Sequence, residues 1–145
     1  MTMTYNEKKH AKSAWVSHAN DIVEKPWGFE TRWSGFSGVH GKTLFIRAGE
    51  RTSFKYNQSK TEVLMLRSGS AEAFFGNELS LDDPIGNPMK TAQMKEGDTL
   101  LVQSGCPYRV SAIENCEIFE IGDNASDHTV MLEDDYGRMT NEKNA

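Results

Sequence analysis

Hydrophobic and polar positions alternate in short runs along most of the chain, and turns that contain glycine or proline separate these runs. Alternation with a period of two is typical of strands that bury one face. Residues 76–95 are rich in Asp, Pro, Gly and Asn, and they predict a hairpin with a long exposed loop. Many short strands with at most one helix predict an all-β sandwich or barrel. The other expected strands are 29–34, 39–48, 62–67, 71–75, 99–103, 108–113 and 117–121.

The N-terminal residues are polar and lack this alternation. Residues 7–19 carry few apolar side chains, Trp15 among them, which allows either a short helix or a docking arm. The sequence KPWG at 25–28 ends any such helix, because proline fixes φ and glycine permits a turn. A chain of 145 residues suits one domain. We expect an N-terminal arm over 1–22 and one domain over 23–140.

Charge and composition narrow the partners and the compartment. The formal net charge is −5 and the sequence has no basic run, which argues against nucleic acid as a partner. No apolar stretch approaches the ~18 residues that a membrane-spanning helix needs, and 1–20 lacks the apolar run of a secretory signal. The two cysteines, Cys106 and Cys116, are not spaced like a redox or zinc motif. We therefore expect a cytoplasmic protein without a membrane partner.

Two glycine-bounded motifs point to a particular barrel. In the first, Gly49 is followed at fixed intervals by Lys55, Asn57, Glu62 and Gly69. These intervals resemble the first cupin motif, Gly-x5-His-x-His-x4-Glu-x6-Gly. The resemblance implies a double-stranded β-helix, a jelly-roll barrel.

The second motif begins at Gly97. Gln103 stands where the second cupin motif, Gly-x5-Pro-x-Gly-x2-His, has proline; Gly105 matches, and Tyr108 replaces the histidine. Side chains two apart on a strand share a face, so positions 55 and 57 enter the barrel together. We expect Glu62 and Tyr108 to converge on them at one end of a barrel that holds one small ligand.

The flanks carry a closer resemblance. Segments 23–30 (VEKPWGFE), 119–121 (FEI) and 127–138 (DHTVMLEDDYGR) are similar to the start and the end of type II mannose-6-phosphate isomerases and of the C-terminal module of mannose-1-phosphate guanylyltransferases. The resemblance implies carbohydrate metabolism and a sugar-phosphate substrate. The tail departs from that pattern at His128 and Met131.

The larger departures lie at the metal ligands. That family has Gln or His, then His, Glu and a second-motif His, whereas this chain has Lys55, Asn57, Glu62 and Tyr108. Only Glu62 is a good ligand for a divalent metal, because the lysine ammonium has no free lone pair. We therefore expect no metal cofactor at these positions.

One interpretation is a metal-free pocket in which Lys55 neutralises Glu62 and binds a sugar or sugar-phosphate-like ligand with Asn57 and Tyr108. Arg47 is a further candidate for a phosphate contact. The alternative is a sugar-phosphate isomerase or epimerase, with Lys55 or Glu62 as the base and Tyr108 as the acid.

Further alternatives remain open. Glu62 could hold an unusual metal with His40 or Cys106, although each of these is also explained as a packed strand residue. The chain could equally be a binding or structural module without chemistry. Similar small barrels pair their N-terminal strands, so we expect a homodimer through Trp15 and the strand at 29–33.

Overall fold

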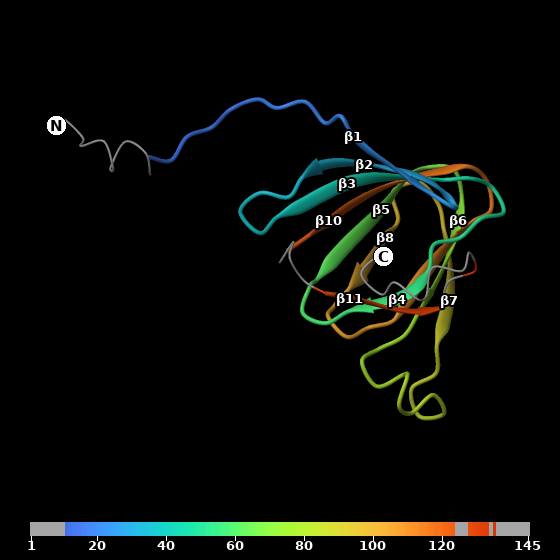
Figure 1. The fold of residues 1–145 in the computed structure, drawn as a ribbon. Coiled ribbons are helices and arrows are strands. Elements are labelled where there is room, and N and C mark those ends of the chain that lie inside the picture. Colours follow the sequence, from blue (N-terminus) through green and yellow to red (C-terminus); the bar gives the residue numbers. More distant parts are fainter. Residues whose placement is uncertain (1–10, 124–127, 134, 136–145) are drawn as a thin grey trace.

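The computed structural model describes residues 11–123, 128–133 and 135. Within this part of the chain, the strands form two antiparallel sheets that face each other (Figure 1). The six-stranded sheet has the order β1-β2-β3-β10-β5-β8, and the five-stranded sheet has the order β11-β4-β9-β6-β7. The strands are β1 Asp21–Lys25, β2 Gly28–Ser34, β3 His40–Ile46, β4 Phe54–Asn57, β5 Glu62–Ser68, β6 Ala71–Phe75, β7 Lys90–Met94, β8 Thr99–Val102, β9 Tyr108–Ala112, β10 Cys116–Gly122 and β11 Thr129–Glu133.

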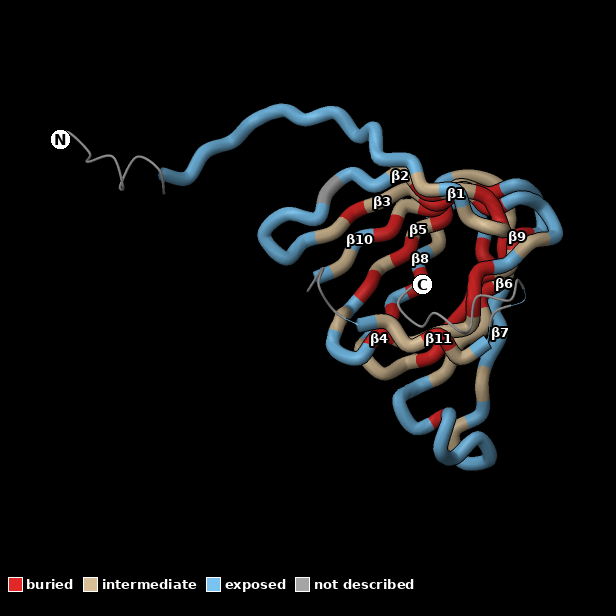
Figure 2. Tube along the Cα trace, in the orientation of Figure 1, coloured by how far each residue is buried: buried red, intermediate tan, exposed pale blue. Residues whose placement is uncertain are grey.

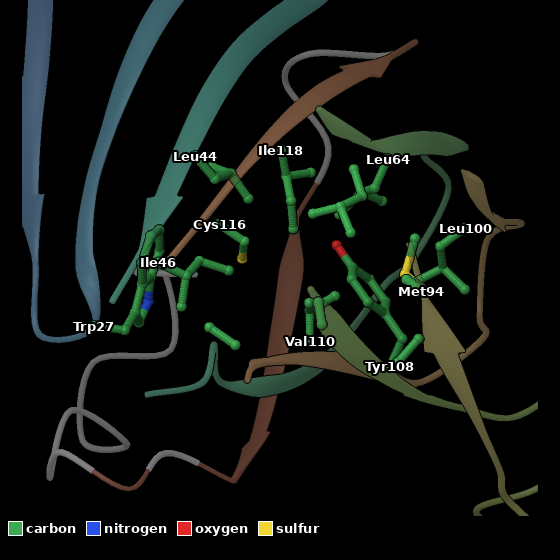
Figure 3. Packing of buried hydrophobic residues seen from close by; sticks show 14 of the residues in the cluster. Trp27, Leu44, Ile46, Leu64, Met94, Leu100, Tyr108, Val110, Cys116 and Ile118 are labelled. Atoms are coloured by element: carbon green, nitrogen blue, oxygen red, sulfur yellow. The ribbon is translucent and has the colours of Figure 1, made fainter. Parts of the chain in front are cut away.

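The core lies between the two sheets, where buried positions from both line the interior (Figure 2). Alternate residues of each strand supply it, as in β5, where Leu64 and Leu66 are buried and their neighbours are more exposed. Figure 3 shows Ile46, Ile118 and Tyr108 in this cluster. Tyr108 is 1% exposed, so its hydroxyl needs a partner inside the barrel.

The all-β architecture predicted from the sequence is confirmed. Each of the separately expected strands is present with ends shifted by a few residues at most, and the hairpin over 76–95 forms from β6 and β7. Strands β1, β4 and β11 were not among the expected runs, although the first motif predicted that positions 55 and 57 lie on a strand, as they do in β4. Strand β1 is polar and mostly exposed, so it lacks the pattern of one buried face.

The short N-terminal helix is not formed over residues 11–19, which are exposed and without regular structure. A helix this short needs an apolar face packed on the domain. Here the segment runs away from the barrel (Figure 1), and Trp15 contacts only the exposed Phe36 ring among the described aromatic residues. Residues 7–10 lie outside the described part. None of the described residues forms a helix of the length and apolar character needed to cross a bilayer.

The two glycines that bound the first motif have backbone reasons to be glycine. Gly49 and Gly69 have φ of +83° and +88°, a region that side chains with a Cβ rarely adopt. A Cβ on Gly69 would also lie 2.2 Å from the carbonyl oxygen of Asn115. These turns fix where β4 and β5 lie, and with them the polar residues that enter the barrel.

Candidate ligand pocket

Three neighbouring strands of the six-stranded sheet bring His40, Glu62 and Glu120 together. In the order β3-β10-β5, Gly122 pairs with both His40 and Glu62, and Glu120 lies two residues from it on the same face. Glu62 and Glu120 are each only 3% exposed. One ligand atom from each of the three side chains lies within 4.8 Å of the others.

The five-stranded sheet supplies hydrogen-bond donors from the opposite side. Asn57 Nδ2 and the Tyr108 hydroxyl both donate to Glu62 Oε1 at 2.7 Å. The Thr129 hydroxyl donates to Asn57 Oδ1, also at 2.7 Å, which fixes the direction of the amide. Lys55 pairs directly with Tyr108 across β4 and β9. The structure therefore brings positions 55, 57, 62 and 108 together in one barrel.

Glu62 is held as a carboxylate. Its Oε2 lies 3.4 Å from Lys60 Nζ and 3.5 Å from His40 Nε2. Burial alone would raise the pKa of Glu62, but the His40 hydrogen bond, the Lys60 charge and the Tyr108 hydroxyl bring it well below its usual range. A carboxylate so well satisfied is a poor proton acceptor.

Tyr108 is correspondingly a poor proton donor to a ligand. Burial is the main cause that raises the pKa of Tyr108 well above its usual range, and the charges of Glu62 and Glu120 raise it further. Its hydroxyl proton is already given to Glu62. Among the three catalytic candidates, Lys55 is thus the group that is not engaged in the Glu62–Tyr108 hydrogen bond, and its amine can accept a proton once it is deprotonated.

A small cavity lies against these residues. Its volume is about 30 Å³, room for about one or two water molecules. Ligand pockets that enclose drug-sized molecules occupy roughly 300–1,000 Å³, so a whole sugar does not fit in this arrangement. The lining residues are Trp27, Glu30, Lys42, Leu44, Thr52, Lys55, Asn57, Lys60, Glu62, Glu120 and Thr129.

The two other carboxylates on the cavity wall also have cationic partners. Lys42 Nζ lies 2.7 Å from Glu30 Oε2, and Lys25 Nζ lies 3.2 Å from Glu30 Oε1. Burial alone would raise the pKa of Glu30, but Lys42, with Lys25, lowers it to about 2. Glu120 Oε2 lies 3.1 Å from His40 Nε2 and 3.5 Å from Lys42 Nζ.

Lys55 takes no part in this pairing of carboxylates with cations among the described residues. Among the described residues, no carboxylate oxygen lies within ion-pair distance of its Nζ, which stands over the Tyr108 ring at 5.0 Å from the centroid. Burial lowers the pKa of Lys55 to about 8, because the attraction of Glu120 and Glu62 does not offset it. The expected direct neutralisation of Glu62 by Lys55 is therefore wrong in detail, since Lys60 and His40 occupy that role.

The four motif positions do not fit a cupin-type metal. Lys55 presents an ammonium, and the amide nitrogen of Asn57 and the hydroxyl of Tyr108 are turned as donors toward Glu62. The set His40, Glu62 and Glu120 is spaced so that it could hold a metal ion. A metal there would compete with the cations already paired to both carboxylates and with a proton on His40, whose pKa is raised by hydrogen bonds to Glu120 and Glu62.

Two other sequence candidates lie apart from the cavity. Arg47 is exposed, and its guanidinium donates to the carbonyl of Pro26 at 2.6 Å. Cys106 packs against the core and makes a long contact of 3.8 Å from Sγ to the Ser104 carbonyl. Neither residue lines the cavity within the described part of the chain.

Sequence reasoning missed Glu30, Lys42, Lys60 and Glu120. A signal for two of them was present, because Lys42 precedes Leu44 and Ile46 in the buried register of β3. Glu120 likewise follows Cys116 and Ile118 in the buried register of β10. A charged residue that continues a buried alternation is a candidate for an internal ion pair.

Comparison with solved structures decides the fold. Over 94% of this chain and 42% of that chain, the structure matches vicilin from Capsicum annuum with a TM-score of 0.68 and 16% identity. The chain has the cupin fold. The same cupin architecture appears in the formate complex of Lactobacillus farciminis oxalate decarboxylase, with a TM-score of 0.65, 12% identity and coverage of 83% of this chain and 38% of that one. KdgF from Halomonas sp. matches with a TM-score of 0.62 and 9% identity over 79% of this chain and 94% of that chain.

The cupin chain is thus less than half as long as the vicilin and the oxalate decarboxylase that it matches. No protein-family model matches its sequence, and no curated protein does. At these identities the likeness concerns the fold alone, and function has to be argued from the pocket.

Proposed function

We propose that this cupin-fold protein binds a small anionic ligand, sugar-phosphate-like in character, whose acidic group enters the cavity beside Lys55. One observation carries the proposal: each carboxylate on the cavity wall is paired with a cation other than Lys55. Lys55 is half-buried and has no counterion among the described residues, an arrangement that is costly for an ammonium, and an anionic ligand would supply the opposite charge.

The size of the cavity indicates that only part of the ligand would enter it. About 30 Å³ admits the oxygens of a phosphate or carboxylate only in part, so the remainder of the molecule would lie outside. Lys42 and Lys60 also line the cavity, and their side chains are 24% and 13% exposed, which places both between the interior and solvent. Their ammonium groups would extend the positive potential toward an approaching anion.

The sequence resemblance to mannose-6-phosphate isomerases indicates the first ligand to test. Thermal unfolding at pH 7 should show a higher Tm with mannose 6-phosphate than with mannose at equal concentration, because binding to the folded state raises Tm. The Lys55→Met variant should lose this difference, whereas Lys95→Met, a change at an exposed position outside the cavity, should keep it. Equal shifts for the phosphate and the neutral sugar, or retention in Lys55→Met, would contradict the proposal.

A sugar-phosphate isomerase or epimerase is a second candidate, and the pKa of Lys55, lowered to about 8, favours it. An amine with this pKa is partly neutral near pH 7 to 8 and can take a proton from a carbon next to a carbonyl. NMR of mannose 6-phosphate in D2O with the protein should show isomerisation or exchange of a carbon-bound hydrogen, and Lys55→Met should abolish either. Activity that disappears with a chelator and returns with a divalent ion would instead indicate the site at His40, Glu62 and Glu120.

A further inference from the structure

We propose that Lys55 is a nucleophile that condenses with short carbonyl acids, of which glyoxylate is the simplest 2-oxo acid, to form a Schiff base inside the barrel. This inference rests on the anion site proposed above and names a substrate class for it.

The position of the amine carries the inference. Lys55 lines the cavity and comes from β4 of the five-stranded sheet, opposite Glu120 and Glu62 on the other sheet. The Tyr108 hydroxyl is committed to Glu62, so Lys55 Nζ meets the aromatic ring of Tyr108. Within the described residues no carboxylate pairs with Lys55, and its side chain lines the cavity, so that the deprotonated amine is available to a carbonyl compound that enters there.

The surroundings suit the reaction. Burial disfavours the charged form of Lys55 and the charge of Lys42 adds to this effect, while Lys42 and Lys60, which also line the cavity, attract the acidic group of the substrate. The lowered pKa of Lys55 agrees with this geometry. A cavity of about 30 Å³ limits the water that could hydrolyse the product, and it favours carbonyl compounds of few atoms, part of which would lie outside it as for the ligand proposed above.

The step balances without another reactant. The lone pair of Nζ forms a bond to the carbonyl carbon, and a proton passes from nitrogen to the former carbonyl oxygen to give a carbinolamine. The carbon–oxygen bond then breaks, the hydroxyl group takes the second proton of the nitrogen and leaves as water, and a carbon–nitrogen double bond remains. Nothing is oxidised or reduced in this condensation.

Borohydride trapping tests the inference on the full chain. The protein is incubated with glyoxylate at pH 8, reduced, digested and mapped by mass spectrometry for lysines that have gained one carboxymethyl group. We expect labelling of Lys55 to be at least about tenfold faster than labelling of the exposed Lys90 and Lys95, because the cavity holds the carbonyl acid beside Lys55 whereas the other two amines meet it only from solvent. Denaturation in urea should bring the rates together.

Two variants make the result decisive. Lys55→Met should lose the fast label and keep the slow surface labels, and Lys55→Arg should lose the label but keep the anion-dependent Tm shift. Labelling of Lys55 no faster than that of Lys90 and Lys95 would overturn the inference. If inorganic phosphate still raised Tm through Lys55 in that case, the anion site would stand and only the Schiff base would fail.

Discussion

Replacing Lys55 by methionine should stabilise the protein at neutral pH. The pKa of Lys55 falls from an ordinary value of 10.5 to about 8. At about 1.4 kcal/mol for each whole-number change in pKa, this corresponds to roughly 3 kcal/mol of unfavourable charging in the folded state. Methionine has a similar volume and no charge, and it loses only the cation–π contact with Tyr108, of about 0.5–2 kcal/mol. The free energy of unfolding should therefore rise by about 1–2 kcal/mol at pH 7.

The pH dependence of the free energy of unfolding is an independent test of the sign of this change. Between pH 8 and 10.5 the unfolded chain binds more protons at Lys55 than the folded chain does, so this residue makes wild-type stability rise with pH in that window. The advantage of Lys55→Met should be largest below pH 8 and fade toward pH 10.5. Urea denaturation of wild type, Lys55→Met and the exposed control Lys95→Met at several pH values measures it. A loss of 2 kcal/mol or more in Lys55→Met at pH 7 would refute the reasoning, because it would reveal a stabilising ion pair at Lys55.

Three other predictions concern the pocket and the surface. Tyr108→Phe should lower the free energy of unfolding by about 1.5–3 kcal/mol in urea titrations, since the hydroxyl donates to the buried Glu62 carboxylate; a loss no larger than that of the control Tyr56→Phe would contradict this. NMR titration should give His40 a pKa above 6.5, and the stability it contributes should be present at pH 6 and disappear as the pH rises through that pKa; a value below 6.5 would contradict the described contacts. Light scattering should give the mass of two chains, and Ile22→Lys on the edge strand β1, where Ile22 is 60% exposed, should give that of one; a one-chain mass for the wild type would remove the dimer.

The fold could be predicted from the sequence because its turns depend on backbone geometry that few residues allow. Gly49 and Gly69 have positive φ, and the intervals between them and Glu62 follow from the strand lengths. The shared face of Lys55 and Asn57 followed from the alternation of side chains on a strand, and the convergence of Glu62 on them was expected from the spacing of the cupin motif. Strand β1 could not be predicted in this way, since its exposed polar residues carry no alternating pattern.

The charge pairing inside the barrel could not be predicted from the motif. Position 62 was expected to be neutralised by Lys55, which is close in sequence and shares the barrel. The partner that reaches it from β3 is His40, which lies far from it in sequence and comes together with it only through the strand order β3-β10-β5. Small differences in the positions of long charged side chains decide which of them form ion pairs, and these positions depend on how all the strands pack together.

The bond pattern at Glu62 has a consequence for how this barrel can change through evolution. A single oxygen of that carboxylate ties β5 of one sheet to β4 and β9 of the other, through Asn57 and Tyr108. Any substitution at these three positions alters the chemistry of the pocket and the join between the sheets together. Lys55 takes no part in these hydrogen bonds between the sheets, so a substitution at this position can change ligand preference while the fold is retained.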